Sequence, residues 1–448
     1  SAILLLVLGL GGMAAGYFVY SRFIAEKIYK LDPDFRTPAH EFEDGVDFVP
    51  TNRFVLWGHH FTSVAGAAPI VGPAIAVIWG WLPAFLWVVL GTIFFAGVHD
   101  SGAIWASVRN RAKSVGALTG EVVGGRARSV FMIVIFLVLL MVNAVFGVVI
   151  AKLLINNPGA VVPVWGAIAV ALVIGQLIYR RKIGLGLVSV VGVAALYALI
   201  YIGPSVPVTL PESTAGLSPN ALWILILFGY AAIASLLPVW VLLQPRDYIN
   251  GLQLFVGLIL LYGAVIIASP TVVAPMINFG VPEGTPSMLP LLFVTIACGA
   301  ISGFHGLVAS GTTSKQLNKE TDARFVGYFG AVGEGALALA AIIAATAGFA
   351  SLADWQAVYT SFGQGSLTAF VDGGAFILAA GTGMEVTVAA TLLTVMAALF
   401  AGTTMDTGLR LQRYIFQEWG EIYNIGWMRK ALPATLLSVA SCLILAFG

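Results

Sequence analysis

Long apolar stretches alternate with short polar ones along almost the whole chain. A helix needs about 20 apolar residues to cross a bilayer, and this criterion predicts about twelve membrane-spanning helices. They are expected near residues 2–20, 53–79, 83–107, 129–154, 161–179, 184–202, 220–243, 251–269, 288–310, 325–348, 386–403 and 431–447. The pattern therefore predicts an all-α polytopic membrane protein.

Lysine and arginine occupy every second gap between these segments. Of the 22 such residues, all except Lys152 lie in six stretches. The six stretches run from Arg22 to Arg53, Arg109 to Arg128, Arg180 to Lys182, at Arg246, from Lys315 to Arg324, and from Arg410 to Lys430. Because cationic loops remain cytoplasmic, we expect both termini of this chain on the outer side of a bacterial-type inner membrane.

The middle ten predicted spans form two sets of five that cross the membrane in opposite senses. Inverted repeats of this kind are typical of LeuT-like secondary transporters, whose first and sixth core helices are discontinuous. The expected division is residues 1–52 (N-terminal helix and cytoplasmic linker), 53–202 (first repeat), 203–410 (second repeat) and 411–448 (C-terminal linker and helix). The second repeat includes an external loop at 349–385, in which we expect a partial or re-entrant helix near 366–381.

Composition supports a membrane protein and argues against other classes. Hydrophobic residues make up 59% of the chain and charged residues 10%, against roughly 25% charged in soluble domains. The net charge of +1 gives no electrostatic reason to expect nucleic acid as a partner. Cys298 and Cys442 both lie in apolar segments, which argues against a disulfide framework. No nucleophile paired with a base is apparent, so an enzyme is not expected.

Two apolar segments contain residues that interrupt helices. Residues 66–73 hold two prolines and two glycines at about mid-depth, and residues 235–238 read Ser-Leu-Leu-Pro in the segment expected to be its inverted partner. Proline removes a backbone donor and clashes with the preceding turn, and irregular backbone at this depth is tolerated only inside protein or beside a wet cavity. The candidate substrate-binding residues are Gly66, Ala67, Ala68, Pro69, Gly72, Ser235 and Pro238.

Helix ends at such a cavity offer partial positive charge to an anion, and unwound carbonyls offer acceptors to a cation. A small molecule that carries a carboxylate fits this site. Alternatively the cation is Na⁺, bound by carbonyls near Ala65 and hydroxyls of Ser302, Thr312 and Thr313.

Ionisable residues inside the apolar segments are candidates for proton coupling, because burying them is costly. Asp100 and Glu334 have no cationic partner nearby in the sequence, and His305 is a further candidate. Asp406 is a fourth candidate, although Arg410 lies one helical turn away and a structural ion pair between them is an equal alternative.

The histidines allow a different class of function. His59, His99 and His305 lie at similar depths, and His60 adjoins the first of them. Together they could bind Zn²⁺ or ligate a haem iron, as in a redox or sensor protein. No metal-ligand spacing is present, so hydrogen-bonded histidines or proton relays are the alternative, and no cofactor is required.

Several motifs resemble one known family. Residues 44–51 (Asp-Gly-Val-Asp-Phe-Val-Pro-Thr), Gly58-His59-His60-Phe61 and the 66–73 segment are similar to motifs of the carbon starvation protein A (CstA) family. Leu237-Pro238-Val239-Trp240, Gln244-Pro245-Arg246-Asp247-Tyr248, residues 298–313, Glu334, and Asp406 with Arg410 follow in the same order.

The resemblance implies an amino acid-polyamine-organocation superfamily architecture. It also implies import of peptides or small carboxylates such as pyruvate, coupled to protons. The expected partners are therefore a small-molecule substrate, H⁺ or Na⁺, and the lipid bilayer. The chain is shorter than the larger members of the family.

Overall fold

The computed structural model describes residues 1–213, 216–300 and 303–447, and this part of the chain is helical. It contains no strand, only an isolated bridge between Thr51 and Leu317. Nine of its helices are long and apolar enough to cross a membrane. They are Ala2–Tyr29 (with α1, Ala2–Ala15, and α2, Ser21–Phe23), Trp81–Arg109 (with α6, Trp81–Gly91, and α7, Gly97–Arg109), Gly125–Asn156 (α9), Pro158–Arg180 (with α10, Val161–Gly175), Leu185–Ser205 (with α11, Leu185–Ile202), Pro219–Leu236 (α12), Leu243–Ala268 (α13), Arg324–Ala347 (with α16, Gly330–Ala347) and Val386–Ile422 (α19).

A tenth span is broken where the sequence predicts a break. Helices α4 (Arg53–Ala65) and α5 (Ala68–Ala76) meet at an angle of 43°. Gly66 takes φ +56° between them, a conformation that glycine adopts without steric cost. The two prolines of this segment do not make the break, because Pro69 lies in the first turn of α5 and Pro73 lies inside that helix.

The prediction of about twelve spans is too high for the part of the chain that the structure describes. Two of the twelve predicted spans, near 288–310 and 431–447, form shorter apolar helices, at Met288–Ala297 and Ala431–Phe447. A third short apolar helix, Ser366–Thr382, lies in the predicted external loop. The first belongs to α14 (Met288–Ala300), which is followed by α15 (Gly303–Gly311); the others are α18 (Ser366–Thr382) and α20 (Ala431–Phe447). Helix α18 matches the helix expected near 366–381, and a short helix α17 (Leu352–Val358) precedes it.

The predicted break at residues 235–238 is instead the end of a helix. Helix α12 stops at Leu236, and Leu237 is extended with ψ 148°, because a residue before proline avoids the helical region. Helix α13 then starts at Leu243, eight residues earlier than the expected span at 251. A discontinuous helix at 220–243 is therefore wrong, and the discontinuity expected for the sixth core helix is not found there.

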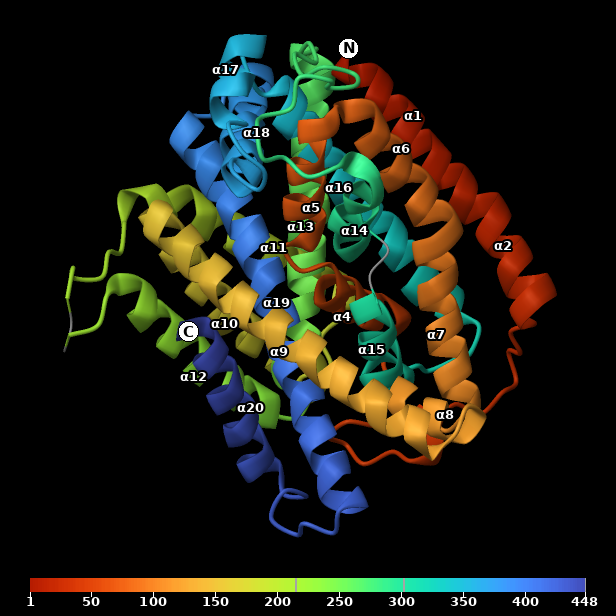
Figure 1. Cartoon of the computed structure of the whole chain (residues 1–448). Helices are drawn as coiled ribbons and strands as arrows, with labels where there is room; N and C mark the ends of the chain where they lie inside the picture. The colour runs from red at the N-terminus through yellow and green to blue at the C-terminus, as the bar shows by residue number, and fades with distance from the viewer. Residues whose placement is uncertain (214–215, 301–302, 448) are drawn as a thin grey trace.

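Small residues allow close packing around α16, which is the most enclosed of the long apolar helices in the described chain. All of its residues except Val332 are buried, and many are alanine or glycine, as at closely packed helix interfaces in membranes. It contacts α5, α18 and α1. Figure 1 shows α5, α13 and α16 in the middle of the bundle, with α1 and α20 at opposite edges.

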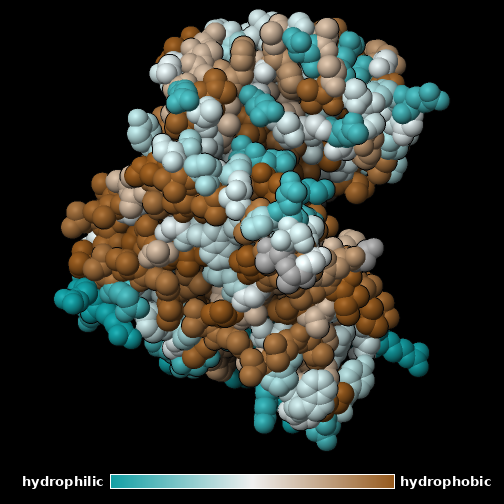
Figure 2. Space-filling view, turned by 90° about the vertical axis from the view of Figure 1, so that its left-hand side faces the viewer, coloured by the Kyte–Doolittle hydropathy of each residue, from teal (hydrophilic) through white to brown (hydrophobic). Residues whose placement is uncertain are grey.

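The outside of the bundle is strongly apolar. Large side chains such as Leu137, Val190, Ile266 and Ile444 are more than half exposed, and brown apolar side chains cover broad areas of the face in Figure 2. An apolar surface of this extent is expected of a protein that faces lipid.

Candidate functional site: a buried network of ionisable residues

Nine ionisable residues from six helices meet inside the bundle. Eight of them are buried, with at most 3% of the residue exposed, and only His99 is partly open, with 43% of its side chain exposed. They are His59 and His60 (α4), His99 and Asp100 (α7), Arg246 and Asp247 (α13), His305 (α15), Glu334 (α16) and Asp406 (α19). Groups of this kind persist in a membrane protein only when they are paired or functional.

Three of the four candidates for proton coupling are in direct contact. His305 places Nδ1 2.8 Å from Asp100 Oδ2 and Nε2 3.0 Å from Glu334 Oε2. A neutral imidazole donates through one nitrogen only, whereas an imidazolium donates through both. His305 can therefore hydrogen-bond to both carboxyl groups only if the triad holds at least one proton more than a neutral imidazole and two carboxylates.

Two more histidines surround Asp100. His60 Nε2 lies 3.6 Å from Asp100 Oδ2, and His99 Nδ1 lies 3.1 Å from Asp100 Oδ1. The partly exposed His99 thus connects the buried carboxylate with the outside of the protein. Imidazole side chains are suited to carry protons because they bind and release them near neutral pH.

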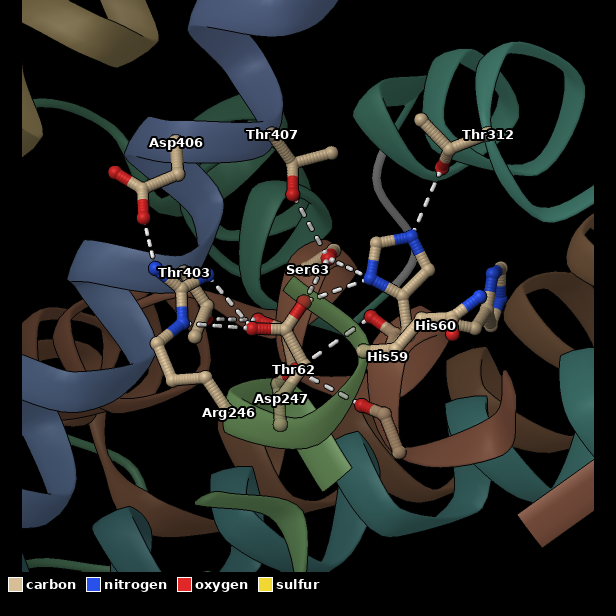
Figure 3. Close-up of polar contacts among 12 residues, drawn as sticks. His59, His60, Thr62, Ser63, Arg246, Asp247, Thr312, Thr403, Asp406 and Thr407 are labelled. Carbon is tan, nitrogen blue, oxygen red and sulfur yellow. Dashed lines mark hydrogen bonds and ion pairs between the residues drawn. The ribbon is translucent and has the colours of Figure 1, made fainter. Parts of the chain in front are cut away.

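The second half of the network is centred on an arginine and two aspartates (Figure 3). Arg246 directs Nε and Nη2 to Asp247 Oδ1, at 2.9 and 2.7 Å, and Nη1 to Asp406 Oδ2. The same Nη1 donates to Tyr230 Oη at 2.6 Å. Asp247 Oδ2 lies 2.7 Å from His59 Nδ1.

Two pairs of neighbouring residues lie between the two halves of the network, one pair on α4 and the other directly after α15. His59 Nε2 lies 3.3 Å from Thr312 Oγ1, and His60 Nδ1 lies 2.9 Å from Thr313 Oγ1. Because His59 and His60 are neighbours on α4, the Arg246 cluster and the Asp100 triad lie side by side, joined through the backbone of this helix and not by a continuous chain of hydrogen bonds in the described structure. Both histidines lie in the last two turns of α4, before the break at Gly66.

The alternative of a structural ion pair between Asp406 and Arg410 is wrong. Arg410 instead places Nη1 2.9 Å from Asp47 Oδ1, and its Nη2 donates to the carbonyls of Ala234, at 3.1 Å, and Leu237. These carbonyls have no intrahelical partner at the end of α12, and a cation there complements the helix dipole. Asp406 forms its ion pair with Arg246.

Asp47 lies in the linker outside the membrane-spanning segments, and its ionised form is stabilised. Burial would raise the pKa of its carboxyl, but Arg410 and Lys315 more than offset this, and the pKa falls below its usual range. Tyr414 also donates to Asp47, at 2.7 Å. The linker is therefore fixed to α19.

Arg246 and Asp247 are functional candidates that sequence reasoning misses. The charge pattern assigns Arg246 to a cytoplasmic gap, whereas it lies in α13 and is 3% exposed. An arginine directly followed by an aspartate at the start of a long apolar run is the available signal, because such a pair is suited to burial.

The candidate substrate residues fall on two different packing surfaces. Gly66 and Gly72 face Thr404 and the carbonyl of Thr295, respectively, and α5, which includes Ala68 and Pro69, packs on α14, α16 and α18; Ala67 precedes it. Ser235 and Pro238 belong to the end of α12, which packs on α9, α19 and α20.

The structure also places the residues of the alternative Na⁺ site and of the alternative metal or haem site. Thr312 and Thr313 bind histidines, Ala65 is the last residue of α4, and Ser302 lies outside the described residues. Within the described chain no group of three or more His, Cys, Asp or Glu residues is arranged to hold a metal ion. His59, His60, His99 and His305 contact aspartate, glutamate or threonine side chains instead.

Comparison with known sequences assigns the family. A family model described as "Carbon starvation protein CstA" matches residues 1–354. The pyruvate/proton symporter BtsT of Escherichia coli K12 is 37% identical over 356 residues, which cover 77% of this chain and 49% of BtsT. The peptide transporter CstA of Campylobacter jejuni is 36% identical over 353 residues, covering 77% of this chain and 50% of the relative.

A third relative aligns along nearly the whole chain. The peptide transporter CstA of Bacillus subtilis 168 is 32% identical over 476 residues, covering 99% of this chain and 79% of the relative. The chain spans about half the length of the first two relatives. The family match and this alignment together show that the chain belongs to the CstA carbon starvation protein family.

Proposed function

We propose that this protein is a secondary transporter that imports peptides or small carboxylates such as pyruvate together with protons. One observation carries the proposal: Asp100, His305 and Glu334 form a contiguous, fully buried triad inside a bundle of apolar helices. Two of the relatives are peptide transporters and a third is a pyruvate/proton symporter, which supports both the substrate class and the coupling ion.

In this mechanism the triad stores the coupling proton. Its imidazole bridges two carboxyl groups, so adding or removing one proton changes which of the two contacts is a hydrogen bond. Because the three groups come from α7, α15 and α16, a change in protonation alters the contacts between three helices. Protonation is thereby linked to the packing that must change during alternating access.

A cavity beside the network supports a route to one side of the membrane. It has a volume of about 470 Å³ and lies between α8 (Val115–Val122), α9, α15 and α19, within the range of ligand pockets. Ser310 and Gly311 line it, directly before the Thr312 that contacts His59. The charged residues in its lining are Arg128, Lys315, Arg429, Glu418 and Glu421. Arg128 is paired with Glu418 at 2.7 Å, so the pocket offers charged groups of both signs to a polar substrate.

The topology is part of the same proposal. We place the protein in a bacterial-type inner membrane with its cationic loops in the cytoplasm and both termini of this chain outside. Residues 53–202 and 203–410 would be the two inverted repeats, flanked by residues 1–52 and 411–448. The break between α4 and α5 supports a discontinuous first core helix.

Uptake into proteoliposomes tests the proposal. Vesicles with an inward proton gradient should accumulate pyruvate, alanyl-alanine or both, and a protonophore should abolish accumulation. The same assay with and without Na⁺ at fixed pH separates proton from sodium coupling. Uptake that needs Na⁺ and ignores the proton gradient would refute proton coupling, and failure to take up or exchange either compound would refute the substrate class.

A further inference from the structure

The two carboxylate partners of Arg246 differ in the number of hydrogen bonds that hold them. Asp247 is fixed at both oxygens, with Oδ1 on the guanidinium and Oδ2 on His59. Asp406 contacts the guanidinium through Oδ2, while its buried Oδ1 has no hydrogen-bond partner in the described structure. Figure 3 shows one Asp406 oxygen toward the guanidinium and the other directed away from it. Asp406 thus has fewer hydrogen bonds to lose than Asp247.

A small cavity opens beside the same guanidinium. It has a volume of about 30 Å³, and Tyr230, Arg246, Asn250 and Thr403 supply its polar lining. This volume exceeds the roughly 10–15 Å³ that one water molecule needs, and it also suits a single carboxylate group. Aromatic and aliphatic side chains, including Trp165 and Leu227, complete the wall.

Asn250 is an unpartnered polar group in this wall. It is 1% exposed, and within the described structure neither its Oδ1 nor its Nδ2 has a hydrogen-bond partner. Buried amides are almost always hydrogen-bonded. An amide donor and an arginine that line one cavity are the groups that recognise a carboxylate.

We propose that this cavity is a carboxylate subsite in which the substrate replaces Asp406 on Arg246. The substrate carboxylate accepts hydrogen bonds from Arg246 and from the amide of Asn250, and Asp406 turns away and takes up a proton. This inference rests on the proposed transport function and names the contact that joins substrate binding to proton binding.

Charge conservation supports the exchange. Arg246 keeps two carboxylates before and after substrate binding, so the guanidinium stays compensated, as a buried arginine requires. The displaced Asp406 would be an unpaired buried anion, which is costly within the membrane unless it is protonated. Arg246 contacts Asp406 directly, while Tyr230 and Asp247 contact the same guanidinium and His59 contacts Asp247. Arg410, one helical turn from Asp406 on α19, is already bound to Asp47 and to two carbonyls of the α12 end.

Binding of matched probes to the purified full chain tests the subsite. The probes are pyruvate, alanyl-alanine, and alanyl-alanine amide, which lacks the carboxylate. For each probe that the wild type transports, Asn250→Ala should weaken carboxylate binding about 10-fold, the loss expected for a hydrogen bond to a charged group. Asn250→Asp should weaken it further by repulsion, and neither change should affect the amide probe.

Asp406→Asn gives an independent readout. The variant should still bind the carboxylate probes, but binding should no longer take up a proton, which is measured from the pH dependence of affinity. Asn220→Ala, on α12 and outside the cavity lining, is the control and should behave as the wild type. Thermal unfolding in detergent verifies that each variant is folded.

The outcomes separate the two proposals. A wild type that transports a probe, together with Asn250 variants of unchanged affinity or an Asp406→Asn variant that still takes up a proton on binding, overturns the subsite and leaves the transport function intact. A wild type that neither binds nor transports pyruvate or alanyl-alanine overturns the proposed function and the subsite together.

Discussion

At the scale of single residues, the sequence identifies ionisable groups but not their partners. Asp100, His305 and Glu334 are each predicted as proton carriers because they are ionisable residues in apolar segments. Their contacts with one another join positions more than 200 residues apart in the case of Asp100 and His305. Such pairings depend on tertiary packing, which one sequence does not reveal.

Local sequence patterns also give the wrong partner for Arg410 and the wrong location for Arg246. Arg410 follows Asp406 by one helical turn, which favours a pair in an isolated helix, but the uncapped carbonyls of α12 and the Asp47 carboxylate bind it instead. The charge pattern assigns Arg246 to a loop because lysine and arginine usually lie in cytoplasmic loops. Arg246 departs from this rule because it is buried and paired with the adjacent Asp247.

Asp47→Asn should lower the stability of the protein in a pH-dependent way. The change leaves Arg410 without its carboxylate, which should cost about 1–3 kcal/mol at pH 7. The pKa of Asp47 is lowered in the folded state from an ordinary value of 3.8. Its contribution is therefore complete above the unfolded pKa and is lost as pH falls through the folded pKa.

Thermal unfolding in detergent between pH 3 and pH 8 measures this effect. The difference between wild type and Asp47→Asn should be constant from pH 5 to pH 8 and should shrink below about pH 4. Asp34→Asn, exposed in the same linker, is the control and should have no effect. A difference that grows at low pH would contradict the ion pair with Arg410.

At the scale of elements, the sequence locates the break in the first core helix but not its cause. Two prolines are expected to interrupt the helix, yet both fit into α5, since proline is tolerated in a first turn and Pro73 lies within the helix. The bend is made at Gly66, whose positive φ is not visible in a sequence. At α12 the opposite occurs, and Pro238 ends the helix.

Gly66→Ala should impair both stability and transport. At φ +56° a side chain strains the backbone, at about 1–3 kcal/mol. The new Cβ would also lie 2.8 Å from Phe146 Cε2 and from Thr404 Oγ1. We expect a lower melting temperature in detergent and reduced uptake in proteoliposomes.

Gly263→Ala is the matched control for this substitution. Gly263 lies inside α13, and a Cβ added there would have no neighbouring atom within 4 Å, so alanine should be neutral or slightly stabilising. Equal melting temperatures for the two variants would show that the conformation at Gly66 does not matter.

At the scale of the whole molecule, hydropathy predicts an all-helical membrane protein and most helix positions. It overestimates the number of long spans, because segments such as 431–447 are apolar but form helices shorter than the bilayer criterion. It also does not show that six helices share one polar network. When the lipid-facing and the buried side of a helix are both apolar, its sequence gives little indication of which helices pack against it.

Reporter fusions test the predicted orientation. A fluorescent protein that folds only in the cytoplasm should be bright when fused after Lys182 and dark when fused after Ser205, because the cationic gap is expected inside and the next gap outside. An alkaline phosphatase that is active only outside should give the reverse pattern. Fluorescence at both positions would contradict the topology.

The most direct test of the central claim measures proton entry during transport. Proteoliposomes that contain a trapped pH indicator should acidify when pyruvate or alanyl-alanine is added to the wild type, because each substrate enters with a proton held by the buried network. Glu334→Gln and Asp100→Asn should abolish this acidification. If both variants acidify the lumen and drive uptake as the wild type does, the triad does not carry the coupling proton.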